Sequence, residues 1–187
     1  VSAVGAWSRT VGYWSRSPWA GHRSLHGQPV VDGVVTNPLA HAVATALAIA
    51  GCRRLDDVEV VETDLYRANA IDSDDTSVVR IRTNQHHRVI CALTLCAPDQ
   101  REPQVHIEGS RGRATFAYTT DRIDVETEDR SRTEITARVD LLENLLAHRQ
   151  DGTPLLVPLA STGAFMRVLD AVAVADEPVR IDPRAIQ

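Results

Sequence analysis

The 187-residue chain contains no lysine, because all 20 of its basic residues are arginine. A chain without lysine cannot form a Schiff base, place a lysine in a P-loop, or use a lysine as a general acid. It also lacks a G-x-G-x-x-G motif after a strand-like segment, so the fingerprint of dinucleotide binding is absent. Met166 is the only methionine, and the chain opens inside a strand-like segment. We therefore expect a piece of a longer protein.

Cysteine and long apolar runs are scarce as well. Cys52, Cys91 and Cys96 form no C-x-x-C pair, which favours buried free thiols in a reducing compartment such as the cytoplasm over a disulfide or a metal site. The longest apolar run, residues 39–50, is too short and too rich in alanine to cross a bilayer. The formal net charge of −5 argues against a nucleic-acid partner. We expect neither a membrane nor a nucleic acid as partner.

Most of the chain has the pattern of β-strands joined by short turns. Consecutive strands with short turns pair antiparallel, since parallel neighbours need long crossovers. Residues 89–96 of the segment 88–96 are uncharged on both faces, so we expect this central strand to be covered on both sides, by helices on one side and by a second subunit on the other. The predicted strands are 1–7, 58–66, 76–83, 88–96, 104–108, 113–118, 122–127, 132–137 and 179–182.

Three segments have helical patterns. The first is predicted to begin at Pro38, with Asn37 as its cap, and to end before Gly51. The second runs over 141–149 with Asp140 as its cap, and the third runs from a Ser161 cap through residue 175.

His41 is the strongest candidate for chemistry. It falls in the first turn of the predicted first helix, and an imidazole can exchange a proton with a substrate hydroxyl near neutral pH. The alternative is a core histidine on an otherwise apolar helix. Asn37 is equally explained as a helix cap alone, and Asp32 with the following glycine as a simple turn.

The segment 13–22 concentrates aromatic rings and arginines without periodicity. Rings stack on sugar faces and arginine binds hydroxyls or carboxylates, so Arg16 and Trp19 are candidates for the wall of a polar pocket. A loop packed over a sheet edge is the alternative. The adjacent pair His86 and His87 has no third ligand nearby, and the acidic segment 72–76 lacks the spacing of a calcium loop, so we expect no metal site.

Several short motifs follow one another along the chain. They are W-S-R-T (7–10), Y-W-S-R (13–16), W-A-G (19–21), D-G (32–33), N-P-L-A-H (37–41), Y-R-A (66–68) and D-D-T (74–76). Each is weak singly, but together and in this order they resemble the C-terminal half of glucose–fructose oxidoreductase/inositol dehydrogenase-type (Gfo/Idh/MocA) oxidoreductases. The resemblance covers nearly the whole chain.

The resemblance implies an α+β fold, with a large, mostly antiparallel open sheet and helices packed on one face. Residues 1–187 would form a single C-terminal domain for substrate binding and oligomerisation, and the N-terminal Rossmann domain, with the family's lysine and nucleotide-binding glycines, is absent from this chain. His41 matches the family's histidine, and Asn37 stands where an aspartate is usual.

The implied parent is an NAD- or NADP-dependent oxidoreductase acting on a sugar or polyol, with this chain alone inactive and free of cofactor. His41 would be catalytic, and Asn37, Arg16, Trp19 and Asp32 would bind substrate in a homodimer or homotetramer. The alternative is a non-catalytic binding or scaffold module of the same fold. A metal hydrolase built on His41, Asp32 and the histidine pair is the least favoured.

Overall fold

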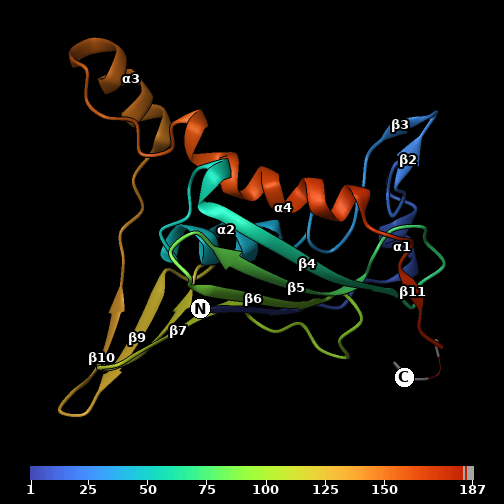
Figure 1. Ribbon diagram of the computed structural model, residues 1–187, viewed down its shortest axis with the longest axis horizontal. Helices are drawn as coiled ribbons and strands as arrows, with labels where there is room; N and C mark the ends of the chain where they lie inside the picture. Colours follow the sequence, from blue (N-terminus) through green and yellow to red (C-terminus); the bar gives the residue numbers. More distant parts are fainter. Residues whose placement is uncertain (183, 185–187) are drawn as a thin grey trace.

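The computed structural model describes residues 1–182 and 184, and its centre is a nine-stranded sheet (Figure 1). The strands lie in the order β10-β9-β8-β7-β1-β6-β5-β4-β11, and β2 and β3 form a separate hairpin. The strand bounds are β1 Ser2–Ala6, β2 Ser24–Leu25, β3 Gln28–Pro29, β4 Val58–Arg67, β5 Thr76–Thr83, β6 Arg88–Thr94, β7 Gln104–Gly109, β8 Gly112–Ala117, β9 Arg122–Thr127, β10 Ser131–Ile135 and β11 Val179–Arg180.

The predicted antiparallel pairing is confirmed within β4–β6 and within β7–β10. Two pairs are parallel, and both involve the ends of the chain: β1 with β6, and β11 with β4. The first strand therefore lies between β6 and β7 and joins the two antiparallel groups. Rules about consecutive strands say nothing about such an insertion.

Helices α2 and α4 cover one face of the sheet, as predicted (Figure 1). A row of fully buried residues crosses four strands beneath them: Val105, Ala3, Cys91 and Val79 are neighbours on β7, β1, β6 and β5. The helix bounds are α1 Val11–Trp14, α2 Ala40–Ile49, α3 Leu141–Asp151 and α4 Gly163–Val174, with short 3-10 turns at Leu55–Asp57 and Leu159–Thr162.

The side of β6 that was predicted to face helices does so, and the opposite face of the central strands, where a second subunit was predicted, is open in the single chain. Val89, Cys91 and Leu93 are buried under the helices, whereas Ile90 is 43% exposed and Ala92 is also exposed. Val4 of β1 pairs with Ala92 and is exposed on the same side. We call this surface of Val4, Ile90 and Ala92 the open sheet face.

The predicted start of the first helix is wrong by two residues. Helix α2 begins at Ala40, its N-cap position is Leu39, and no side chain caps it. The Asn37 amide donates instead to Asp32, and residues 34–39 form a series of turns before the helix. A tertiary partner has therefore replaced the local capping bond.

Of the N-caps predicted for the last two helices, the one for α3 is correct and the one for α4 is wrong. Asp140 accepts hydrogen bonds from the backbone N–H groups of Leu142 and Glu143 and caps α3, and Gly152 ends that helix in a left-handed conformation, both as predicted. The predicted cap of α4 at Ser161 is wrong. Ser161 lies in a 3-10 turn and donates its hydroxyl to Pro158, and Thr162 holds the N-cap position of α4.

No helix in the part of the chain that the structure describes has both the length and the apolar character to cross a membrane.

The three thiols are free, and their surroundings hold them in the protonated form. Burial raises the pKa of Cys91 to about 12, and burial together with the nearby Asp75 carboxylate raises that of Cys96 to about 11. Burial also raises the pKa of Cys52.

We therefore expect iodoacetamide at about pH 8 to alkylate the folded chain's Cys91 and Cys96 more than about a hundredfold more slowly than the urea-unfolded chain, because only thiolate reacts. The thiols also lose their protons at a higher pH in the folded chain than in the unfolded chain. The free energy of unfolding should therefore fall as the pH rises above about 8.5, the ordinary pKa of a thiol. Mass spectrometry of timed reactions measures the rates, and equal rates in the two states would contradict the burial.

Candidate functional site

The buried carboxylate of Asp32 organises the segment around the first helix. It accepts hydrogen bonds from the backbone N–H of Gly21 at 2.8 Å, from Nη2 of Arg16 at 3.0 Å and from Nδ2 of Asn37 at 2.6 Å. Asp32 is 5% exposed, and its bond from Gly21 is buried, whereas the bonds from Arg16 and Asn37 are partly open to water. The carboxylate thereby links the segment 13–22 to the turns that lead into α2. Three of the five predicted site residues, Arg16, Asp32 and Asn37, meet at this point.

Arg16 is also held by aromatic rings. Its guanidinium carbon lies 3.8 Å from the centre of the Tyr13 ring and 4.8 Å from that of Trp19, and its Nη1 donates to the Tyr13 carbonyl. Arg9 stacks in the same way over Trp7 at 4.7 Å and over Tyr13 at 5.0 Å. The result is an alternating ladder of three rings and two guanidinium groups, ending at the partly exposed Trp19.

Sequence reasoning singled out Arg16 and Trp19 but missed Arg9. The sequence does contain a hint, because aromatic residues and arginines alternate along Trp7, Arg9, Tyr13, Arg16 and Trp19. Their irregular spacing, however, does not predict that the rings and the guanidinium groups lie face to face, as cation–π stacking requires.

His41 lies apart from this cluster, at the second position of α2, with its side chain exposed. The helix start that carries it is seated close to β1: a Cβ atom on Gly5 would lie 2.6 Å from the Leu39 side chain. Glycine at this position lets the start of α2 approach the strand. The imidazole is thus neither buried among aliphatic side chains nor fixed by the Asp32 hydrogen bonds, and it is free to meet a molecule from outside.

Two further buried aspartates support the turns below Asp32. Asp75 accepts hydrogen bonds from the backbone N–H groups of Ala68 and Asn69 and from the Asn69 amide. Asp74 accepts from the hydroxyl of Ser77 at 2.7 Å, and burial raises the pKa of its carboxyl group. Sequence reasoning predicted only a capped turn here, because burial of successive acidic residues cannot be read from their spacing.

Asp74 also explains the glycine that follows Asp32. A Cβ atom on Gly33 would lie 1.9 Å from Oδ1 of Asp74, and the backbone N–H of Val34 donates to the Asp74 carbonyl at 3.0 Å. Gly33 therefore lets the turn carrying Asp32 rest directly on the buried acidic pair. The position of the site depends on this contact.

Within residues 1–182 and 184, no group of three or more histidine, cysteine, aspartate or glutamate side chains is placed to hold a metal ion. A hollow of about 710 Å³ lies away from the Asp32 cluster, at the hairpin ends of β7–β9, and none of the five predicted site residues lines it.

No family model and no curated protein matches the sequence. Solved structures do match the fold. UDP-N-acetylglucosamine 3-dehydrogenase GnnA from Acidithiobacillus ferrooxidans has a TM-score of 0.68 at 12% identity, over 100% of this chain and 54% of that chain. The WlbA dehydrogenase from Bordetella pertussis, in complex with NADH and UDP-GlcNAcA, has a TM-score of 0.63 at 16% identity, over 91% of this chain and 53% of that chain.

Aldose-aldose oxidoreductase from Caulobacter crescentus, complexed with glycerol, has a TM-score of 0.66 at 13% identity, over 91% of this chain and 51% of that chain. The chain spans about half the length of these oxidoreductases. At such identities the likeness establishes the fold alone: a large mixed sheet with helices on one face, as found over about half the length of these oxidoreductases.

Proposed function

We propose that the chain is the substrate-binding and oligomerisation domain of an NAD- or NADP-dependent oxidoreductase that acts on a CH–OH group of a sugar or polyol. Its fold neighbours include dehydrogenases and an aldose oxidoreductase, in complexes with NADH and a UDP-sugar in one case and glycerol in another. The observation that carries the proposal is the Asp32 cluster, which places an arginine, an amide and an exposed ring beside the helix that carries His41.

The cluster supplies groups suited to a polyhydroxylated substrate. Asn37 uses one amide N–H on Asp32 and keeps a carbonyl oxygen and a second N–H for a hydroxyl. Trp19 offers a partly exposed ring on which a sugar can stack, and the Arg16 guanidinium lies beside that ring. Asp32 acts through these residues as a positioning group, since it is buried and already accepts from three donors.

His41 takes the proton of the reacting hydroxyl through its imidazole and returns it in the reverse direction. The nicotinamide cofactor supplies the hydride acceptor when bound. This chain has neither a dinucleotide glycine motif nor a lysine, so its residues do not fit a nicotinamide site of their own. A separate nucleotide-binding domain holds the cofactor, and the chain alone is inactive. With three free thiols, the protein suits the reducing cytoplasm.

Replacing His41 with alanine tests this role. The chain is expressed together with whatever coding sequence precedes Val1 in its reading frame, and sugars and polyols are assayed with NAD and with NADP. We expect His41→Ala to lower kcat by about 10²–10⁴-fold with a small change in KM, because a general base acts in the transition state.

His87→Ala is the matched control, since His87 is an exposed histidine in the turn between β5 and β6. It should leave kcat unchanged. An unchanged kcat in His41→Ala as well would remove His41 from the mechanism.

A scaffold or binding module of the same fold is the second candidate, and one observation favours it. Asn37 provides an amide where the resembled family has a carboxylate, so the position cannot exchange a proton. The preceding reading frame separates the two functions: a G-x-G-x-x-G motif after a strand supports the oxidoreductase, and its absence supports the scaffold.

The open sheet face is the proposed subunit interface of a homodimer or homotetramer. Val4 and Ile90 are each 43% exposed there, and Ala92 lies between them in the sheet. Exposed apolar residues bordered by charged ones, here by Arg80 opposite Ile90, are typical of an interface between copies.

A further inference from the structure

Helix α3 carries a face of four leucines that the rest of the chain leaves uncovered. The spacing of Leu141, Leu142, Leu145 and Leu146 puts them on one side of the helix, and each is between 44 and 63% exposed. We call this the leucine face. In Figure 1, α3 stands clear of the sheet and of α2, at the end of an extended arm formed by residues 136–158. Soluble monomers rarely expose contiguous leucines in this way.

Hydrogen bonds within the arm hold α3 against residues 153–156, so the leucine face has a defined orientation on the arm. Asn144 donates its amide to the carbonyl of Pro154 and accepts from the backbone N–H of Leu156. The ring Nδ1 of His148 lies 2.8 Å from the Thr153 carbonyl oxygen. Asn144 and His148 sit on the side of α3 away from the centre of the leucine face, so the returning chain covers the polar side of the helix and leaves the leucines outward.

The base of the arm directs α3 away from the chain's own hairpin ends. Arg138 donates from Nε to Asp121 at 2.7 Å and from Nη2 to the Thr119 carbonyl at 3.3 Å. The backbone N–H of Thr136 donates to the Asp121 carbonyl at 2.9 Å. These bonds attach the arm to the turn between β8 and β9, whereas the β7–β8 and β9–β10 hairpin turns lie at the opposite end of the strands.

The hairpin ends form a groove that matches this helix, which we call the tip groove. Its floor is a row of apolar residues that are neighbours on three strands: Ile107, Ala114 and Val125. The row continues the face on which Val105 is buried, so it belongs to the side of the sheet that the helices cover, beyond their reach. The hollow above it measures about 710 Å³, room for several leucine side chains.

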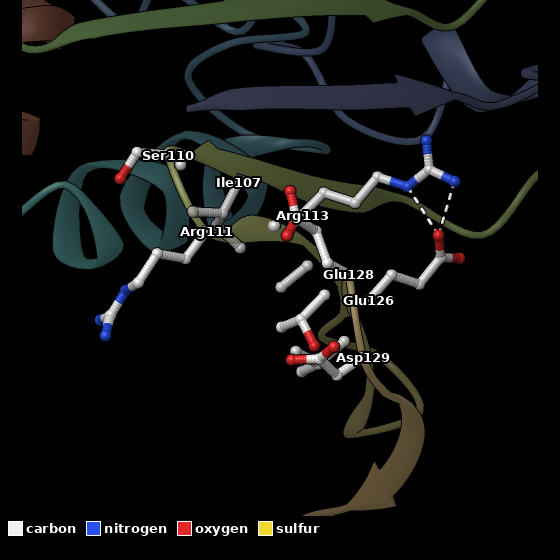
Figure 2. A pocket seen from close by; sticks show the side chains of 12 residues that line it. Ile107, Ser110, Arg111, Arg113, Glu126, Glu128 and Asp129 are labelled. Atoms are coloured by element: carbon white, nitrogen blue, oxygen red, sulfur yellow. Dashed lines mark hydrogen bonds and ion pairs between the residues drawn. The ribbon is translucent and has the colours of Figure 1, made fainter.

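The charges at the two ends of the tip groove have opposite signs. Arg111 projects from the β7–β8 turn on one side, and Glu128 and Asp129 lie at the β9–β10 turn (Figure 2). Arg113 points away from Arg111 and binds Glu126 with two hydrogen bonds, so this pair neutralises itself (Figure 2). The two turns are two strand spacings apart, about 9.6 Å.

Helix α3 carries a positive charge on its leucine face. Arg149, four residues after Leu145, lies on that face near the C-terminal end of the helix. Glu143 lies about 120° around the helix from Arg149 and points away from the face. A helix laid across the strands can therefore set Arg149 near the acidic turn.

We propose that α3 of one chain docks in the tip groove of a second copy, with the leucine face on the apolar floor. A two-fold axis would repeat the contact, because each chain offers one arm and one groove. The occupant is a second copy because the attachment of the arm points α3 away from its own groove and because Arg149 on the leucine face complements Glu128 and Asp129 of the same sequence. This interface is separate from the open sheet face and does not depend on the proposed function.

The experiment uses the Ile90→Asp chain, in which association through the open sheet face is blocked, and measures mass by sedimentation across a range of concentrations. We expect a dimer. Arg149→Glu should raise the dimer dissociation constant on the order of a hundredfold, because the new glutamate meets Glu128 and Asp129 in both contacts. Adding Glu128→Arg and Asp129→Arg to that variant should restore the dimer.

Two further variants test whether the dimer depends on the leucine face or on non-specific association of exposed apolar residues. Leu142→Gln with Leu145→Gln should abolish the dimer and leave the circular dichroism of the body intact, since these side chains are solvent-exposed on the arm. Val174→Gln, a change at an even more exposed valine on α4, should have no effect. The proposal is overturned by a monomeric Ile90→Asp chain, by an unchanged dimer in Arg149→Glu, or by a failed charge-swap rescue.

Discussion

Replacing Gly33 with alanine is expected to lower the free energy of unfolding by about 3 kcal/mol. The new Cβ atom would lie 1.9 Å from Oδ1 of Asp74 and 2.8 Å from Oγ of Ser73, and both of those residues are fully buried. Overpacking alone costs about 1–3 kcal/mol, and moving Asp74 also strains its hydrogen bond from Ser77. Urea denaturation followed by tryptophan fluorescence measures the change.

Gly12→Ala is the matched control for this substitution. Gly12 lies in α1, and its added Cβ would meet only the Thr10 hydroxyl oxygen, at 3.8 Å. Alanine is the better helix former, so this variant should be as stable as the parent or slightly more stable. Equal stability of the Gly33 and Gly12 variants would show that the turn before α2 does not rest on Asp74 as described.

The second large effect is expected from Asp32→Ala, which should lower the free energy of unfolding by about 3 kcal/mol. The substitution leaves the buried N–H of Gly21 without its acceptor and removes the partner of Arg16. The Arg16 side chain remains a quarter exposed, so water recovers part of the loss, and the full cost of breaking a buried ion pair does not apply. Urea denaturation at several salt concentrations checks the value.

The exposed pair of Arg80 and Asp64 provides the comparison. Their side chains are 47% and 42% exposed, so Asp64→Ala should cost less than about 1 kcal/mol. Asp32→Asn should fall between the two, because it keeps one acceptor oxygen and loses the charge. A cost for Asp32→Ala no larger than that for Asp64→Ala would argue against Asp32 as the organising group of the site.

The strands were the most predictable part of the fold. Strands β5 and β9 have the predicted bounds, because alternation and turn residues mark both of their ends. The placement of β1 between β6 and β7 could not be predicted, since a strand's distant partners depend on packing against the whole sheet. The resemblance to a known family implied that the strands form one large sheet with helices on one face.

Four of the five predicted site residues come together in the structure, and His41 takes no part in their contacts. The motifs singled out Arg16, Trp19, Asp32 and Asn37, but not the hydrogen bonds and the stacking that connect them. The helix-cap prediction for Asn37 failed because a buried carboxylate is a stronger partner for its amide than free N–H groups at a helix end. The stacking of Arg9 was missed although its ring partners are near in sequence, and the contact of Asp74 with Gly33 joins residues distant in sequence.

Transfer of deuterium tests the central claim most directly. The chain, expressed with the coding sequence that precedes it, is incubated with NAD or NADP and with polyols deuterated at the carbinol carbons, and the nicotinamide is examined by mass spectrometry. We predict reduced cofactor that carries the deuterium, and loss of that product in His41→Ala. Cofactor that stays oxidised with every sugar and polyol, from a protein shown to bind the nucleotide, would contradict the account.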